Sequence, residues 1–224
     1  MMLASQLFSE PIHINSDSVA VLCVENKQLY RNLISACINE CPEEIGFVFS
    51  QNFKPIKFKG NACFVNDFYN LNLSSSVLKK IYENISLFCN VDLQQETINL
   101  KSLIATFLEK IMMNYEYDFT CDFELDLVNL FKIQDLKPNI STENLCHSLL
   151  DFLVLLSKYS KVKCFILLNM HLYFTDDELT LLFKEFVYNK LNVLVLENNC
   201  NFRKTQYETV RIIDEDLCEI IAKE

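Results

Sequence analysis

Unbroken apolar runs predict three buried strands, one near the start of the chain and two in its last third. The run Val19–Val24 is bounded by polar residues, and Val162–Leu168 and Val193–Leu196 have the same character. Runs of this kind are typical of parallel strands that are covered on both faces. Thr175 and Glu178, between the last two runs, have the spacing of a helix capping box. Strand, helix and strand in this order predict a parallel βαβ unit.

The residues after the first strand predict one helix and a small antiparallel patch. Apolar residues recur at three- and four-residue spacing from Leu29 to Cys41, and a proline ends the run, which predicts a helix. Three short strands are then expected, at Ile45–Ser50, Pro55–Phe58 and Ala62–Val65. We expect these three strands to pair with one another.

Apolar residues with helical spacing dominate the middle of the chain and indicate a helical domain distinct from the α/β domain. Four helices are expected there: one that begins at the serines 74–76, one over Leu100–Tyr115, one over Leu125–Ile133, and one capped by Ser141 and Thr142. The sequence therefore predicts a helical domain at residues 74–156. This helical domain is inserted into an α/β domain of residues 1–73 and 157–224, which is expected to contain a parallel or mixed sheet. A last strand at Val210–Ile213 is expected to complete that sheet.

The scarcity of glycine excludes the common nucleotide-binding loops. The 224 residues contain only two glycines, Gly46 and Gly60, so neither a P-loop nor the dinucleotide-binding glycine motif can be written in this chain. Such loops need glycine where backbone amides approach phosphate oxygens closely. We therefore expect a binding function before a catalytic one, with no bound nucleotide and no catalytic residue.

The ten cysteines and the apolar runs indicate a cytoplasmic protein. No apolar run reaches the roughly 18 residues of a membrane span, and the N-terminus lacks a basic region before an apolar stretch. The cysteines are scattered without a C-x-x-C pair, which speaks against a zinc ribbon. They are interpreted as small buried hydrophobic residues in a reducing compartment.

Five carboxylates form an acidic cluster between two of the expected helices: Glu116, Asp118, Asp122, Glu124 and Asp126. Carboxylate oxygens on a flexible connection suit calcium, although the spacing is not that of an EF-hand. A solvated junction between helices explains the same cluster. A magnesium-dependent nuclease is a third interpretation, weakened because Asp126 stands where that pattern needs a lysine.

Basic residues form local clusters although the formal net charge is −10. Lys54, Lys57 and Lys59 alternate with Phe53 and Phe58. Lysines spaced in this way can follow a phosphate backbone without reading its sequence, or they can protect an edge strand from aggregation. Two further clusters are Lys158, Lys161 and Lys163, and Arg203 with Lys204.

The three histidines are isolated in the sequence. His13 and His147 give no sign of a site, and His171 follows a buried strand, where ligand sites of α/β proteins often lie. No nucleophile elbow accompanies His171. An ordinary hydrogen-bonded histidine is expected at each position.

With these features located, the chain resembles one family, the type II-A CRISPR adaptation proteins of the Csn-two family. The resemblance covers most of the chain. The residues that carry it are Ser9–Ile12, the strand Val19–Val24, Tyr30, Phe53–Lys57, Asp67–Tyr69, and above all Val162–Glu197 with its helix start Leu172–Glu178.

The resemblance implies a ring-shaped homotetramer whose α/β head is a degenerate relative of the P-loop ATPases and whose leg is helical. Such rings hold double-stranded DNA, preferably at free ends, and work with the CRISPR integrase complex and effector nuclease. It also implies calcium, for which the matching ligands here are Glu116, Asp118, Asp122 and Glu124. The candidates for the DNA-lining residues are Lys54, Lys57 and Lys59 first, and Lys132 and Lys137 second. The alternatives are a protein-interaction scaffold that does not bind DNA and a metal-dependent nuclease.

Overall fold

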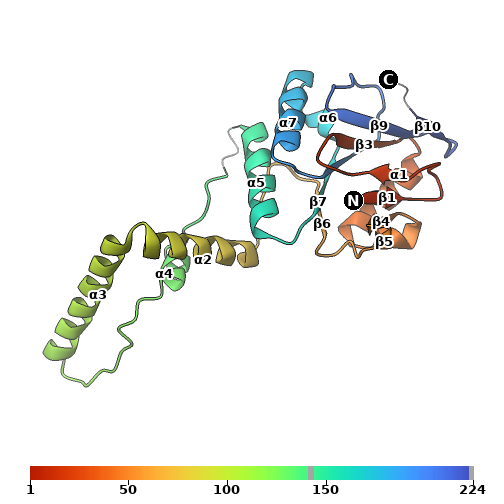
Figure 1. Cartoon of the computed structure of the whole chain (residues 1–224). Coiled ribbons are helices and arrows are strands. Elements are labelled where there is room, and N and C mark those ends of the chain that lie inside the picture. Colours follow the sequence, from red (N-terminus) through yellow and green to blue (C-terminus); the bar gives the residue numbers. More distant parts are fainter. Residues whose placement is uncertain (141–143, 222–224) are drawn as a thin grey trace. The chain divides into compact units, whose positions relative to one another are not determined.

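The computed structural model describes the whole chain except residues 141–143 and 222–224 (Figure 1). The chain divides into two compact units. The α/β unit contains Met1–Asn72 and Ile140–Glu224, and the helical unit contains Leu73–Asn139. The α/β class and the helical insertion expected from the sequence are both present.

A six-stranded sheet forms the centre of the α/β unit. Its strands, in spatial order, are β10 (Glu219–Ile221), β9 (Glu208–Ile213), β3 (Val19–Val24), β8 (Val193–Glu197), β7 (Cys164–Leu168) and β6 (Ala62–Val65). β9, β3, β8, β7 and β6 run parallel, and β10 is antiparallel to β9. Every residue of β3 and β8 is buried, as the unbroken apolar runs predicted.

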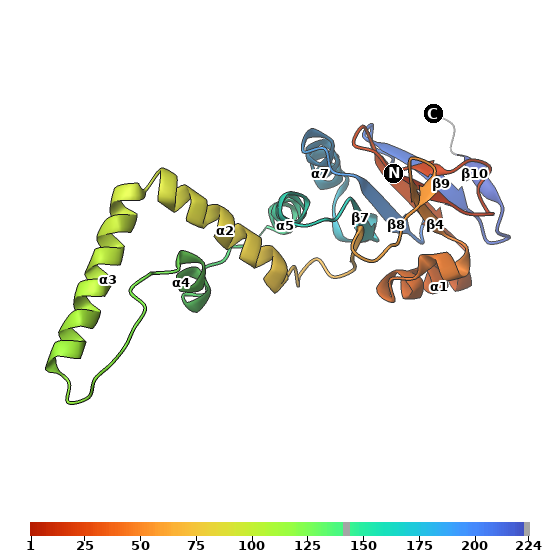
Figure 2. The same cartoon turned by 60° about the horizontal axis from the view of Figure 1, so that its bottom comes forward.

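Helices cover both faces of this sheet (Figure 2). On one face, α1 (Lys27–Ile38) packs Leu33 into a core cluster with Leu194 and Leu196 of β8. On the other face lie α7 (Asp176–Tyr188), which contacts β3, and α5 (Leu145–Tyr159), which contacts α7. The expected capping box begins α7, because the Thr175 and Glu178 side chains bond each other's backbone amides.

A second, four-stranded sheet packs against the α1 face of the core. Its order is β2 (Ile12–His13), β1 (Met2–Ala4), β4 (Val48–Gln51) and β5 (Lys54–Pro55), and a short 3-10 helix, η1 (Pro42–Ile45), precedes β4. The expected patch of three strands is wrong in one member. Ala62–Val65 does not join this sheet but pairs in parallel with β7. Each of its residues pairs with one that is 102 positions away in the sequence, so local spacing could not show it.

The helical unit contains α2 (Ser75–Val91), α3 (Gln94–Asn114) and α4 (Leu127–Ile133). α2 contacts both other helices, and the rings of Tyr82 and Phe131 join α2 to α4 with centroids 6.2 Å apart. The Thr97 hydroxyl of α3 donates to the Cys89 carbonyl of α2 at 2.9 Å, which fixes the turn between them.

The helical unit ends earlier than the sequence indicated. The expected helical domain of 74–156 includes α5, whereas the structure groups α5 with the α/β unit. Leu149 and Leu153 of α5 are fully buried, and α5 contacts α7. The expected cap at Ser141 and Thr142 lies outside the described residues, and the N-cap of α5 is Asn144, whose side chain accepts from the His147 amide.

Candidate nucleic-acid interface

The hairpin β4–β5 and the residues that follow it carry the first group of expected DNA-binding residues. Asn52 and Phe53 form its two-residue turn with positive φ angles of 51° and 60°, as in the primed turns that suit the twist of a hairpin. Phe53 is 89% exposed at the tip, and Lys54 follows it as the first residue of β5. Phe58 is buried, as expected, while Lys57 and Lys59 are exposed.

Two lysine clusters that are about 100 residues apart in the sequence meet at this hairpin. Asn61 joins them, because its side chain donates to the Lys57 carbonyl at 2.9 Å and its carbonyl accepts from the Lys163 amide at 2.7 Å. The Lys163 ammonium donates to Gln51 Oε1 at 2.8 Å, and Gln51 is the register partner of Lys54. We call the resulting set the basic edge: Lys54, Lys57, Lys59, Lys161 and Lys163.

Most of the basic edge is free to meet an external anion. All five lysines are exposed. Lys59 pairs with Glu40 at 2.9 Å, and both side chains are solvated, so water screens that pair. Within the part of the chain that the structure describes, the other four lysines form no ion pair. Of the neighbouring cluster, Lys158 instead lies over the Tyr159 ring, 5.2 Å from its centroid.

The second pair of expected DNA-binding residues belongs to the helical unit. Lys132 lies in the last turn of α4 and is exposed. Lys137 is paired with Asp135 at 2.7 Å, and this hydrogen bond raises the pKa of Lys137. Lys137 is therefore the less available of the two, and no observation joins either residue to the basic edge.

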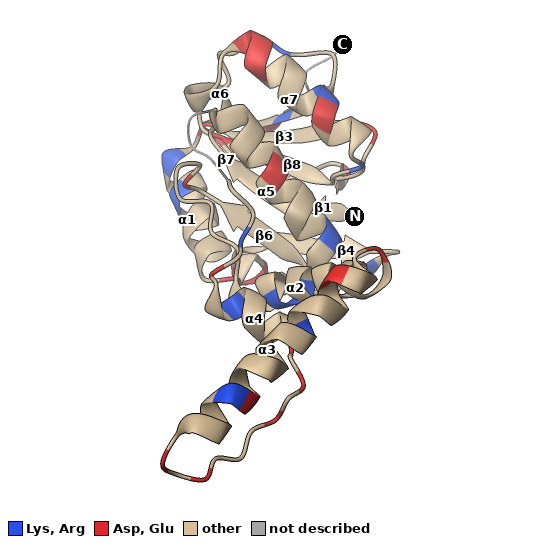
Figure 3. Ribbon diagram, turned by 90° about the vertical axis from the view of Figure 1, so that its left-hand side faces the viewer, with Lys and Arg blue, Asp and Glu red and all other residues tan. Residues whose placement is uncertain are grey.

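The expected calcium ligands lie on the irregular segment between α3 and α4, which Figure 3 shows dotted with acidic positions. Glu116, Asp118, Asp122 and Glu124 are all exposed. Asp122 accepts the Glu124 amide at 2.9 Å, and the fifth carboxylate, Asp126, caps α4. In the described residues, no three His, Cys, Asp or Glu side chains are gathered as a metal site. One chain in this conformation therefore does not fit a calcium ion, which needs six to eight oxygens.

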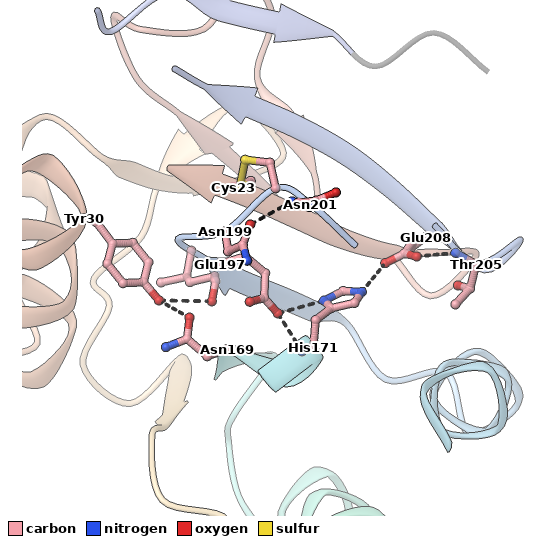
Figure 4. Close-up of polar contacts among 11 residues, drawn as sticks. Cys23, Tyr30, Asn169, His171, Glu197, Asn199, Asn201, Thr205 and Glu208 are labelled. Carbon is pink, nitrogen blue, oxygen red and sulfur yellow. Dashed lines mark hydrogen bonds and ion pairs between the residues drawn. A yellow bond between two sulfur atoms is a disulfide. The ribbon is translucent and has the colours of Figure 1, made fainter. Parts of the chain in front are cut away.

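A buried acid–histidine cluster lies at the carboxyl ends of β7 and β8 (Figure 4). Glu197, the last residue of β8, accepts from the backbone amide of His171 at 3.0 Å and lies 2.8 Å from its ring Nδ1. The other ring nitrogen, Nε2, lies 3.6 Å from Oε2 of Glu208, the first residue of β9. The side chains of His171, Glu197 and Glu208 are 6%, 4% and 0% exposed. Burial raises the pKa of the Glu208 carboxyl.

The sequence pattern pointed to only part of this cluster. His171 was expected to be an ordinary hydrogen-bonded histidine, and Glu208 was not singled out. The available signal was Glu197, a carboxylate that directly ends a buried strand. Beside it, Tyr30 donates to Asn169, and burial raises the pKa of the Tyr30 phenol far above its usual value. A cavity of about 260 Å³ opens here, lined by Asn169, His171, Leu172, Glu197–Asn199, Asn201 and Phe202.

One cysteine pair contradicts the expectation that all ten are free thiols. Cys23 of β3 and Cys200, in the segment after β8, form a disulfide with Cα atoms 5.9 Å apart. The remaining eight cysteines are free. Pairing depends on how the chain brings residues 177 positions apart together, which the scattered spacing did not reveal.

Comparisons with known proteins identify the family. A family model described as CRISPR-associated protein (Cas_Csn2) matches residues 41–217. No curated protein matches. A solved structure described as a putative ABC transporter (ATP-binding protein) from Pyrococcus furiosus shares 14% identity and a TM-score of 0.43, over 94% of this chain and 97% of that chain, which is too distant to bear on function. No helix in the described residues is long and apolar enough to cross a membrane. The match over most of the chain shows that it belongs to the Cas_Csn2 family of CRISPR-associated proteins.

Proposed function

We propose that this chain is a non-catalytic CRISPR adaptation protein that assembles into a ring-shaped homotetramer and holds double-stranded DNA without reading its sequence. Membership of the Cas_Csn2 family supports the role in adaptation. The observation that carries the DNA-binding part is the basic edge, where two separate lysine clusters meet around Asn61. We place the protein in the cytoplasm, beside the integrase complex and effector nuclease that the family resemblance implies.

The basic edge suits a phosphate backbone because its charges are exposed and its segments are joined by hydrogen bonds. Lys54 and Lys163 are held on neighbouring elements by the Gln51 hydrogen bond and by strand pairing. Each lysine that contacts a phosphate releases a condensed counterion, so affinity falls steeply with salt. Contacts of this kind position a protein on the duplex and carry no base preference.

The net charge of −10 does not oppose this proposal, because many of the negative residues lie in other segments of the chain. The acidic segment between α3 and α4 lies in the helical unit, and the first turn of α7 carries Asp176, Asp177 and Glu178. A local patch of one sign determines where an anion binds, and the walls of a ring would focus its field.

Exposed apolar side chains on the helical unit support self-assembly. Thr97 is the one buried residue of α3, whereas Leu103 is 68% and Phe107 64% exposed on the same helix. Other large apolar side chains of this unit are also open to solvent: Leu87, Phe88, Val91, Ile98, Ile111 and Met113. An exposed apolar surface on this scale is typical of an interaction site, and a second copy of the chain is the partner we propose.

We propose calcium binding only for a different arrangement of the acidic segment or for the assembled protein. Glu116, Asp118, Asp122 and Glu124 are not gathered within one chain, so a bound ion would need a rearranged segment or donors from a second copy. Calcium binding is therefore a separate prediction, measured by calorimetry on the full-length protein. DNA binding at the basic edge does not depend on it.

A gel-shift experiment with linear and circular duplexes of one sequence tests the proposal. We expect the wild-type chain to bind linear duplex and leave its length unchanged in the presence of magnesium. Replacing Lys54, Lys57 and Lys59 together by Glu should abolish the shift. The matched control replaces Lys79, Lys80 and Lys184 by Glu, which changes the net charge equally outside the basic edge.

Each alternative function gives a distinct result in the same gels. A chain that shifts no duplex at low salt is the protein-interaction scaffold. Shortened DNA with magnesium identifies the metal-dependent nuclease. Equal loss of binding in the test and control variants would show that overall charge, and not the basic edge, determines affinity.

A further inference from the structure

The segment Asn198–Thr205 covers the buried acid–histidine cluster. The Phe202 ring stacks on the His171 ring with centroids 3.8 Å apart. At the start of the segment, the Asn198 side chain donates to the Val24 carbonyl at 2.7 Å. At its end, the Thr205 amide donates to the Glu208 carboxylate. The segment therefore forms a cover held at both ends and packed on the histidine between them.

The buried polar groups of the cluster under the cover lack a full set of hydrogen-bond partners within the described residues. Two carboxylates face one imidazole, and all three side chains are at least nine-tenths buried. Among the residues that the structure describes, Nε2 of His171 and Oε2 of Glu208 have no hydrogen-bond partner, although they lie 3.6 Å apart. Buried polar atoms without a full set of hydrogen bonds destabilise the closed arrangement. Hydration of the cluster would therefore favour an open cover.

The disulfide opposes that opening. Cys200 lies within the cover, two residues before Phe202, and its partner Cys23 is a fully buried residue of the central strand β3. Figure 4 shows Cys23 beside the cluster. The bond thus ties the middle of the cover to a strand whose residues are all buried.

Three free cysteines in α1, β6 and β7 are poor competitors for this bond. Burial raises the pKa of Cys37 and Cys164 to about 12 and that of Cys63 to about 11. These groups are therefore thiols at neutral pH, and the thiolate is the reactive form in disulfide exchange.

We propose that the Cys23–Cys200 disulfide is a redox-controlled latch, which holds Asn198–Thr205 closed over His171, Glu197 and Glu208 and releases it on reduction. The reductant is a small cytosolic thiol or a dithiol protein. Its thiolate attacks Sγ of Cys200, the partly exposed partner, and the S–S bond breaks. Cys23 leaves as a thiolate and takes a proton. A second donor thiol cleaves the mixed disulfide, restores the Cys200 thiol and forms the oxidised donor disulfide, so two electrons pass to the protein.

Release of the cover would widen the cavity beside the carboxyl ends of β7 and β8 and let water reach the buried cluster. The amides of Asn198–Glu208 would then exchange with solvent more readily, whereas we expect no change in the separate sheet β2–β1–β4–β5. The inference does not rest on DNA binding.

Hydrogen exchange of the full-length protein, oxidised and reduced, tests the latch. Reduction should accelerate exchange about 10-fold or more in peptides covering 198–208 and 169–174, with no change in peptides covering 2–13. Cys200→Ser should reproduce the reduced pattern under oxidising conditions. Cys218→Ser, which removes an exposed free thiol, is the matched control and should behave as wild type.

Thiol counting gives the second readout and avoids dependence on a variant that fails to fold. Alkylation of the oxidised protein after denaturation should label the eight free cysteines and spare Cys23 and Cys200, which label after reduction. The proposal is overturned if Cys23 and Cys200 label fully in oxidant-treated folded protein. It is equally overturned if oxidised and reduced wild-type chains exchange alike over 198–208.

Discussion

Phe53→Gly should stabilise this protein even though it removes an aromatic side chain. Phe53 has a φ of 60°, and the left-handed region costs a residue with a Cβ about 1–2 kcal/mol. Glycine adopts this region freely but loses more chain entropy on folding, about 0.5–1 kcal/mol. Because Phe53 is 89% exposed, little burial is lost. The new Asn-Gly turn is the preferred two-residue hairpin, and the expected net gain is about 0.5–1 kcal/mol.

Thermal unfolding measures this gain. A stabilisation of that size raises the Tm of a chain this long by roughly 1–4 °C. Asn52→Gly is the matched control, because asparagine already tolerates its φ of 51°, and its Tm should change little. An unchanged or lower Tm for Phe53→Gly would refute the assignment of strain to this turn.

The same variant separates stability from the proposed function. An exposed aromatic ring beside Lys54 can stack on an unpaired or terminal base, and such stacking contributes about 1–3 kcal/mol. Phe53→Gly should therefore bind linear duplex at least about 5-fold more weakly while unfolding at a higher temperature. A variant that gains stability and keeps full affinity would exclude the ring from the interface.

Three further predictions concern the buried cluster, the latch and assembly. Burial raises the folded-state pKa of Glu208, so its contribution to stability is complete below about pH 4.5 and is lost as pH rises through the folded pKa. Glu208→Gln should thus gain stability over wild type between pH 5 and 7.5 in urea unfolding, and a difference independent of pH would contradict this. Cys200→Ser removes a crosslink spanning 177 residues, and the chain-entropy model limits the resulting loss of stability to about 5 kcal/mol. We expect this variant to have a lower Tm than the oxidised wild type, and we expect reductant to leave that Tm unchanged. A variant Tm that still falls on reduction would count against the Cys23–Cys200 disulfide. Leu103→Asp with Phe107→Asp should reduce the mass measured by light scattering, with each chain still folded, and an unchanged mass would remove α3 from the assembly interface.

The local sequence pattern was sufficient to predict helices and strands whose formation depends mainly on residues within the same segment. The run Val19–Val24 became β3 with identical bounds, because burial on both faces needs only continuous apolar residues. The capping box at Thr175 formed as its spacing indicated. Helix periodicity likewise located α3, whose apolar residues are nonetheless exposed in the single chain.

Features that depend on contacts between residues far apart in the sequence could not be predicted from the local sequence pattern. From its neighbours in the sequence, Ala62–Val65 looks like a hairpin strand, yet it pairs in parallel with β7. Two neighbouring parallel strands must be joined by a long connection, so the partner of a parallel strand lies far away in the sequence. The basic edge needed the same long-range pairing, since Asn61 places Lys57 beside Lys163. Glu208 begins a strand and carries no motif, so its approach to His171 followed only from the three-dimensional arrangement.

The most direct test of the account is the salt dependence of binding to a linear duplex, for wild type and for a variant with all five lysines of the basic edge replaced by Gln. The plot of log K against log salt concentration should lose roughly 0.9 in slope for each lysine that contacts a phosphate, and the variant should bind more weakly at every salt concentration. If the two proteins give the same slope, or if the wild type does not bind at low salt, DNA binding at the basic edge is wrong.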